Sequence, residues 1–93
     1  MTLLLKDPAA LLDYAVDWGA DYLNEDQVAA SAWSVEPQED DGLSVLASDH
    51  GLTQTSVTVL GGVAGHVYRL INHATFVSGR EDQRAIVVRV EWR

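Results

Sequence analysis

The sequence predicts an all-β fold built as an antiparallel β-sandwich of six to seven strands. Short segments in which apolar and polar residues alternate recur along the chain, turn-forming residues separate them at intervals of about 8–12 residues, and no long segment has the spacing of an amphipathic helix. In addition, a glycine-rich stretch at residues 60–65 leads directly into a segment whose first inward residue is Tyr68. A tyrosine in this position closes a corner in many immunoglobulin-like domains, so we expect an immunoglobulin-like sandwich.

The composition fits a single globular domain over residues 1–93. Hydrophobic residues make up 47 % of the chain and charged residues 22 %, the balance of a folded protein. Because there is no cysteine, we expect neither a disulfide framework nor a thiolate metal site, and folding in a reducing cytoplasm is favoured. The apolar runs are far shorter than the roughly 20 residues of a membrane helix, and no signal peptide is recognisable. No membrane contact is expected.

The charge is negative and unevenly distributed. The net charge of −8 disfavours a nucleic-acid partner bound through its phosphates. Residues 1–50 contain eleven acidic residues and one lysine, whereas residues 51–93 contain three acidic residues and five arginines. Two interpretations follow. Acidic early strands could pair with arginine-bearing late strands within the domain, or the polar molecule could dock head-to-tail or against a basic neighbour in an assembly.

The first segments are an arm, a strand and an acidic turn. Residues 1–8 are expected to form an extended N-terminal arm, because Pro8 disfavours a helix at the residue before it. The alternative is a single helical turn that starts at Pro8. In residues 12–18 large apolar side chains alternate with aspartate or alanine, which predicts a strand with one buried face. Residues 21–26 are acidic and turn-forming, and a helical turn there would pack Tyr22 and Leu23 against the core.

The second strand is predicted over residues 28–35 and is weaker, because most of its side chains are small. Trp33 and Val35 share a parity that Val28 does not, so we expect a bulge or a twist between Val28 and Trp33. Residues 36–42 contain proline, glycine and four carboxylates and are expected to form a loop.

Four further strands follow. Residues 43–48 and 53–60 form the third and fourth, residues 66–74 the fifth, and residues 85–92 the sixth, with a hairpin tip at residues 78–82. The side chains of the last two strands that we expect to face the core are Tyr68, Leu70, Asn72 and Ala74, followed by Ile86, Val88, Val90 and Trp92.

The corner before the fifth strand is expected to be structural. Gly61, Gly62 and Gly65 supply backbone geometry, and Tyr68 should hydrogen-bond to the backbone of the corner. A helix does not follow these glycines, so they are not a phosphate cradle. Asn72 is the polar member of an inward row and should tie the end of its strand to a neighbouring loop.

The first and last predicted strands, residues 12–18 and 85–92, are expected to lie side by side at a sheet edge. This arrangement would place Asp13 or Asp17 near Arg89 and would explain part of the charge distribution.

No catalytic, cofactor-binding or metal-binding residues are predicted, and the chain is not expected to be an enzyme. The acidic loop lacks the ligand spacing of a dedicated calcium loop. His66 and His73 would lie about 23 Å apart on opposite faces of one strand, too far to share a metal, and His50 lies elsewhere. Neither a nucleophile elbow nor a cysteine nucleophile is present.

The outer face of the last hairpin is the best candidate for a partner-binding surface. It carries Ile71 and Val87 between Arg69, His73 and Arg89. Apolar residues on a solvated face are either scattered singly or part of a contact patch, and we take the patch as the hypothesis.

Four motifs in fixed order span nearly the whole chain. They are Lys6-Asp7-Pro8-x-x-x-Leu12-Asp13-Tyr14-x-x-Asp17-Trp18, Ala32-Trp33-Ser34-Val35, Leu60-Gly61-Gly62-x-Ala64-Gly65-x-x-Tyr68-x-Leu70-x-Asn72, and Gly79-Arg80-x-Asp82-x-Arg84-x-Ile86-x-Val88-x-Val90. With these motifs the chain resembles small tailed-phage and prophage virion proteins of the fibre–tail adaptor type. The loop at residues 37–42 departs from this resemblance, because it is longer and more acidic than the expected Pro-x-Gly-Leu.

The resemblance implies a non-enzymatic structural protein of the neck or tail. It implies contacts with other phage neck or tail proteins, and with copies of the chain itself as a further candidate. The charge and the short apolar runs, in turn, favour neither a nucleic-acid nor a membrane partner. The implied location is the virion, and the host cytoplasm during assembly. The alternative is a ligand- or glycan-binding sandwich, which is disfavoured because all three tryptophans share parity with core residues or sit at strand ends.

Overall fold

The computed structural model describes residues 2–19 and 25–92, and the predicted helical turn with Tyr22 and Leu23 lies largely outside them. Within the described residues no helix is long and apolar enough to cross a membrane. The described chain forms seven strands: β1 (Thr2–Lys6), β2 (Leu12–Asp17), β3 (Val28–Glu36), β4 (Ser44–His50), β5 (Gln54–Leu60), β6 (Val67–Phe76) and β7 (Glu81–Val90).

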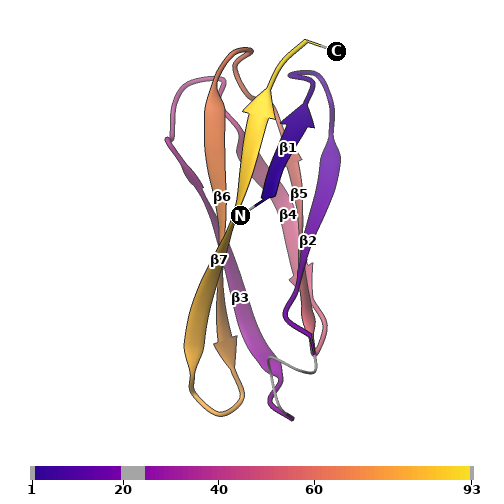
Figure 1. Cartoon of the computed structure of the whole chain (residues 1–93), viewed down its shortest axis with the longest axis vertical. Helices are drawn as coiled ribbons and strands as arrows, with labels where there is room; N and C mark the ends of the chain where they lie inside the picture. Colours follow the sequence, from indigo (N-terminus) through magenta and orange to yellow (C-terminus); the bar gives the residue numbers. More distant parts are fainter. Residues whose placement is uncertain (1, 20–24, 93) are drawn as a thin grey trace.

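The strands pack as two layers (Figure 1). One sheet has the order β1-β7-β6-β3 and the other the order β2-β5-β4. The prediction of an all-β sandwich is confirmed, and the strand order is compatible with the immunoglobulin-like arrangement, in which the second, fifth and fourth strands share a sheet. One pair departs from the expected antiparallel pattern, because β1 runs parallel to β7.

The expected N-terminal arm is for the most part a strand. Residues 2–6 pair with residues 86–90 of β7, so they extend the larger sheet. The side chain of Lys6 is fully buried at the end of β1, and its Nζ donates hydrogen bonds to the carbonyl oxygens of Asp7 (2.9 Å) and Gly61 (2.8 Å). Burial lowers the pKa of this ammonium group, which Asp7 partly offsets. The lysine thereby fastens β1 to the glycine-rich corner.

The predicted pairing of residues 12–18 with residues 85–92 is wrong. The first of these segments forms β2, which pairs with β5 in the smaller sheet. The edge of β7 near its C-terminal end is instead taken by β1, whose run of leucines was not assigned to a strand. Arg89 Nε lies 2.5 Å from Glu91 Oε1, rather than near Asp13 or Asp17.

Other element predictions hold with small shifts. The register between β3 and β6 slips between Val28 and Ala30, where the bulge was expected. The inward residues of β6 and β7 are buried as far as Val90. Trp92 is an exception, because β7 ends at Val90 and the indole is 75 % exposed. Beyond Val90 the chain turns to β1, where the Glu91 N–H donates to the Lys6 carbonyl.

The core lies between the sheets and centres on Trp18. Its ring packs edge-on against Phe76, with 5.5 Å between ring centroids, and the Arg84 guanidinium lies 4.4 Å from the Trp18 ring centroid. Arg84 Nη1 also donates to the Asp17 carbonyl (3.1 Å). Arg84 of β7 therefore links the larger sheet to the smaller one, whereas the sequence predicted such a contact for Arg89.

Candidate functional site

The glycine-rich corner is held by Tyr68. Its side chain is fully buried, and the Val63 N–H donates to the Tyr68 hydroxyl oxygen at 3.0 Å, as the sequence predicts. The same hydroxyl donates to Glu39 Oε1, which also lies 2.7 Å from His66 Nδ1. The hydrogen bonds from Tyr68 and His66 lower the pKa of Glu39, while burial and then the bond to Glu39 raise the pKa of Tyr68.

Glu39 is a residue that sequence reasoning missed. It lies in the acidic loop, which was expected to be solvated, yet it joins this loop to the corner across 29 positions in sequence. Nothing local in the sequence marks one carboxylate of four as the partner of a tyrosine, because the contact depends on how β3 and β6 pair.

The corner requires glycine at two positions for spatial reasons. Gly62 has φ +108°, and a Cβ there would lie 2.6 Å from Val90 Cγ2. Gly61 has φ +78°, and a Cβ there would lie 2.8 Å from the Gly42 carbonyl oxygen. At Gly65 a Cβ would meet open space, although its φ of +89° still favours glycine.

The five proposed partner-binding residues lie on one surface, the outer face of the larger sheet. Val87 is paired with Arg69 and Ile71 is paired with Ala85, so Ile71 and Val87 are diagonal neighbours on adjacent strands. Both apolar side chains are half-buried, while His73 lies farther along β6 and Arg89 farther along β7.

Arg69, His73 and Arg89 each contact an acidic side chain. Arg69 Nη1 lies 3.5 Å from Glu36 Oε2, and His73 Nε2 lies 3.1 Å from Glu81 Oε1. Arg89 is paired with Glu91, as described above. Glu36 is directly opposite Arg69 in the β3–β6 register, so a correct strand pairing would have predicted this contact.

The apolar part of the face is larger than predicted. Leu5 of β1 and Val67 of β6 are both paired with Arg89 in the sheet, one on each side, and are 44 % and 47 % exposed. Leu5 was missed because its segment was assigned to the arm. We call these four apolar residues the outer-face patch: Leu5, Val67, Ile71 and Val87.

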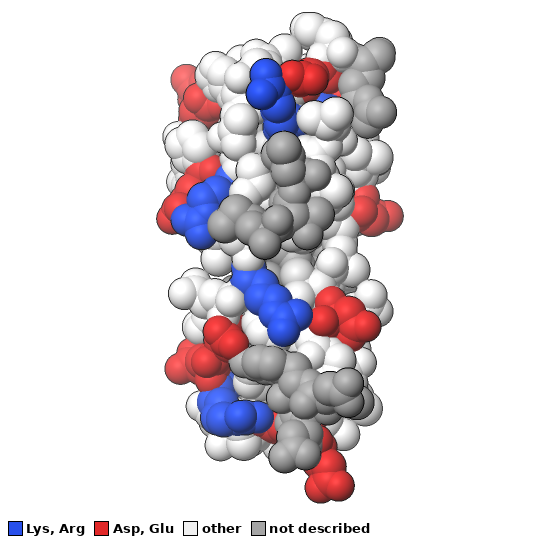
Figure 2. Space-filling view, in the orientation of Figure 1, with Lys and Arg blue, Asp and Glu red and all other residues white. Residues whose placement is uncertain are grey.

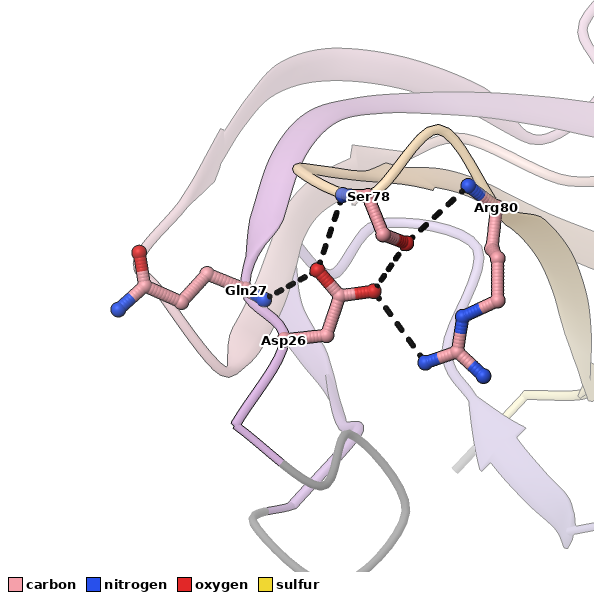
Figure 3. A network of polar contacts seen from close by, with 4 residues as sticks. All are labelled: Asp26, Gln27, Ser78 and Arg80. Carbon is pink, nitrogen blue, oxygen red and sulfur yellow. Dashed lines mark hydrogen bonds and ion pairs between the residues drawn. The ribbon is translucent and has the colours of Figure 1, made fainter.

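A second polar network fixes the β6–β7 hairpin tip (Figure 3). The Asp26 carboxylate accepts hydrogen bonds from the Ser78 hydroxyl (2.6 Å), the Ser78 N–H (3.1 Å) and the Gln27 N–H (3.0 Å). Arg80 Nη2 completes the set at 3.2 Å. These bonds, above all that from the Ser78 hydroxyl, lower the pKa of Asp26 to about 2. The tip of the hairpin is thereby tied to the segment that precedes β3.

The ion pairs support the interpretation that the acidic first half of the sequence pairs with arginines of the second half within the domain. Glu36 and Asp26, from the acidic half of the sequence, pair with Arg69 and Arg80 from the other half. On the face that Figure 2 shows, acidic and basic side chains are accordingly interspersed.

The histidines are dispersed. His66 and His73 each contact a different glutamate, and the His50 Nδ1 lies 2.9 Å from the Gly51 carbonyl oxygen. Among the residues that the structure describes, no group of three or more histidine, cysteine or carboxylate side chains could hold a metal ion.

Comparison with known families gives one informative match. The family model described as "Podophage GP4 fiber-tail adaptor protein gp77" matches residues 6–89. No curated protein matches the chain. The matched residues include six of the seven strands almost completely and the end of β1.

Proposed function

Because this chain belongs to the podophage GP4 fibre–tail adaptor family, we propose that it joins other virion proteins through non-covalent contacts and catalyses no reaction. Its partners under this proposal are neck, tail or fibre proteins, with further copies of the chain as a second possibility. It would be made in the host cytoplasm and reside in the virion. The family match supports the structural role, and the surface of the sandwich supports the particular contacts.

The outer-face patch is the observation that carries the proposed contact surface. Stable protein interfaces need an apolar centre that loses its water, surrounded by polar groups. Here Ile71 and Val87 form the centre, and Leu5 and Val67 extend it across three strands. Arg89 lies between Leu5 and Val67, Arg69 lies opposite Val87, and His73 lies beyond Ile71 on β6, so polar side chains are interspersed with the apolar ones.

The patch is also preorganised. Directly beneath it, the inward side chains of the same strands are fully buried: Tyr68, Leu70, Val88 and Val90 are each 0 % exposed. A surface fixed on hydrogen-bonded strands loses little conformational entropy when a partner binds. Binding of a partner to this face should therefore cost little conformational entropy, so that burial of apolar area contributes directly to affinity.

The polar side chains of this face contribute to partner binding in a different way. Exposed ion pairs are worth at most about 1 kcal/mol each, so they steer association more than they hold the complex. Because Arg69, His73 and Arg89 each already contact a carboxylate, a bound protein would have to satisfy or displace these contacts. This favours a partner that presents both signs of charge at matching positions.

The test is a double substitution at the centre, Ile71→Asp with Val87→Asp. Both side chains lie on the solvent face, so we expect the isolated domain to keep its far-ultraviolet circular dichroism spectrum while its incorporation into particles is lost. A control with Leu52→Asp and Val77→Asp places the same charges at residues that are 61 % and 67 % exposed outside the patch. A folded centre variant that assembles at the normal copy number would overturn the proposal.

The exposed indole of Trp92 supports a second candidate, a glycan- or ligand-binding module. Exposed aromatic side chains can stack against sugars, and the expectation that Trp92 faces the core is wrong. A glycan array probed with the wild type and with Trp92→Ala tests it. Binding that is lost in Trp92→Ala would favour this candidate, and an array without hits would exclude the glycans tested.

A further inference from the structure

A cleft opens between the two sheets on the side where β3 and β4 are the edge strands. Its volume is about 600 Å³. Trp33 and Val35 of β3 line one wall, Leu43 and Val45 line the other, and residues 38–42 of the connecting loop line its end. We call it the β3–β4 cleft.

One border of this cleft is an open strand edge. Among the described strands, β4 pairs only with β5, and all seven of its residues are exposed. The register slips between Val45 and Ala47, which leaves Leu46 at a bulge with its side chain 60 % exposed. An edge strand with an unpaired backbone ladder and exposed apolar side chains is a surface to which an extended chain can add.

One residue that lines the cleft, Trp33, carries a hydrogen-bond donor that is not used. The Trp33 Nε1 atom is buried and has no acceptor in the described part of the chain. By contrast, Trp18 Nε1 donates to Asn72 Oδ1 at 3.1 Å. Buried donors in folded proteins are nearly always satisfied, so the Trp33 indole favours a ligand that brings an acceptor, such as a backbone carbonyl.

The charge around the cleft defines its occupant further. Asp40 and Asp41 are exposed at its end, and their side chains make no hydrogen bond or ion pair within the part of the chain that the structure describes. None of the residues that line the cleft is basic. Glu39 is already held by Tyr68 and His66, which fixes the loop that carries the two aspartates.

We propose that the β3–β4 cleft is the docking site for an extended, basic segment of a second virion protein, which adds as a strand to the free edge of β4. One apolar side chain of the segment would enter the cleft beside Val35 and Leu43, a backbone carbonyl would accept the Trp33 indole proton, and lysine or arginine would lie near Asp40 and Asp41. The inference rests on the proposed adaptor role, because an adaptor must contact two partners and the outer-face patch can hold only one.

An NMR titration of the isotope-labelled chain tests the site directly. The probe is a synthetic peptide of alternating valine and lysine, and its counterpart carries glutamate in place of lysine. The lysine peptide should shift the backbone amides of β4 and the indole N–H signal of Trp33, and leave the indole signals of Trp18 and Trp92 in place. The glutamate peptide should shift none of them. Shifts that map to β7 or to the outer-face patch, or an absence of binding, would overturn the proposal.

Paired variants separate local recognition from general attraction to an acidic protein. Asp40→Asn with Asp41→Asn should weaken binding of the lysine peptide about fivefold, the worth of two exposed charge pairs. Asp17→Asn with Glu25→Gln removes the same charge from exposed positions outside the cleft and should change the affinity by less than about twofold. Equal effects of the two double variants would overturn the proposal. Neither variant alters the outer-face patch, so failure here is distinguishable from failure of the Ile71 and Val87 test.

Discussion

Asn72 of β6 and Thr55 of β5 are joined across the two sheets, with the Thr55 hydroxyl donating to Asn72 Oδ1 at 2.7 Å. The same oxygen accepts the Trp18 indole proton, and Asn72 Nδ2 donates to the Ser31 hydroxyl at 2.8 Å. Asn72 and Thr55 are both fully buried. The amide therefore does not tie a strand end to a loop, as the sequence suggested, but fastens one sheet to the other in the middle of the core.

Replacing this amide should be costly. Asn72→Leu leaves the buried Thr55 hydroxyl and the Trp18 indole without their acceptor, and we expect the free energy of unfolding to fall by about 2–4 kcal/mol. Thr55→Val removes one donor and keeps the shape, so its cost should be about 1 kcal/mol. Urea unfolding of both variants measures these values. An Asn72→Leu protein as stable as wild type would show that the network contributes nothing to stability.

The corner makes a second prediction. Tyr68→Phe keeps the buried ring but deprives the Val63 N–H of its acceptor and Glu39 of a donor, so we expect a loss of about 1–2 kcal/mol. Glu39→Gln keeps an acceptor for Tyr68 and removes only the charge, and should cost less. A Tyr68→Phe protein that melts with wild type would mean that the glycines alone hold the corner.

The inward rows of β6 and β7 were predictable because a period of two is a local property of the chain. Tyr68, Leu70 and Asn72 alternate with polar or half-exposed residues, and a strand with one buried face has no other way to place them. The outer-face residues Ile71 and Val87 follow from the same parity.

Strand β1 was not predictable on the same grounds. Its leucines follow one another without alternation, and the residue that reaches the core at its end is a lysine. The buried Lys6 ammonium group donates to the carbonyl oxygens of the adjacent Asp7 and of Gly61 in the distant corner, and the second of these bonds exists only after folding. Because residues 2–6 were not predicted to form a strand, the edge of β7 was assigned to β2, and Leu5 was left out of the predicted contact surface.

Glu39 and Asp26 were missed for a related reason. Their sequence neighbourhoods are those of ordinary acidic loops, and their partners Tyr68 and Ser78 lie 29 and 52 positions away. The pairing depends on tertiary structure rather than on local pattern.

The hairpin-tip network predicts an acid-sensitive contribution to stability. The pKa of Asp26 is about 2 in the folded protein against an ordinary 3.8. Because the folded-state value is the lower one, the contribution is complete above the unfolded pKa and is lost as the pH falls through the folded one. Wild type should therefore exceed Asp26→Asn in stability at pH 6, and the difference should shrink between about pH 4 and pH 2.

Thermal unfolding of both proteins across this pH range measures the effect. Ser78→Ala is the matched variant, since loss of the largest contribution to the Asp26 pKa should reduce the same pH-dependent difference. A constant difference between wild type and Asp26→Asn at every pH would contradict the assignment, because it would mean that the carboxylate titrates normally in the folded protein.

The last prediction concerns Leu5, the residue that joins β1 to the proposed contact surface. If the outer-face patch binds a partner as one surface, Leu5→Asp should reduce incorporation into particles, as we expect for Ile71→Asp with Val87→Asp, because a charge at the border of a dry interface must be desolvated on binding. Leu5→Thr introduces a β-branched side chain, which should support β1 while removing only part of the apolar area, so its effect should be intermediate. Leu11→Asp, at a residue that is 58 % exposed outside the patch, is the control. Hydrogen exchange at the amides of β1 distinguishes loss of the strand from loss of the contact. If Leu5→Asp keeps β1 protected and assembles like the control, the partner contacts only β6 and β7, and the patch ends at Val87.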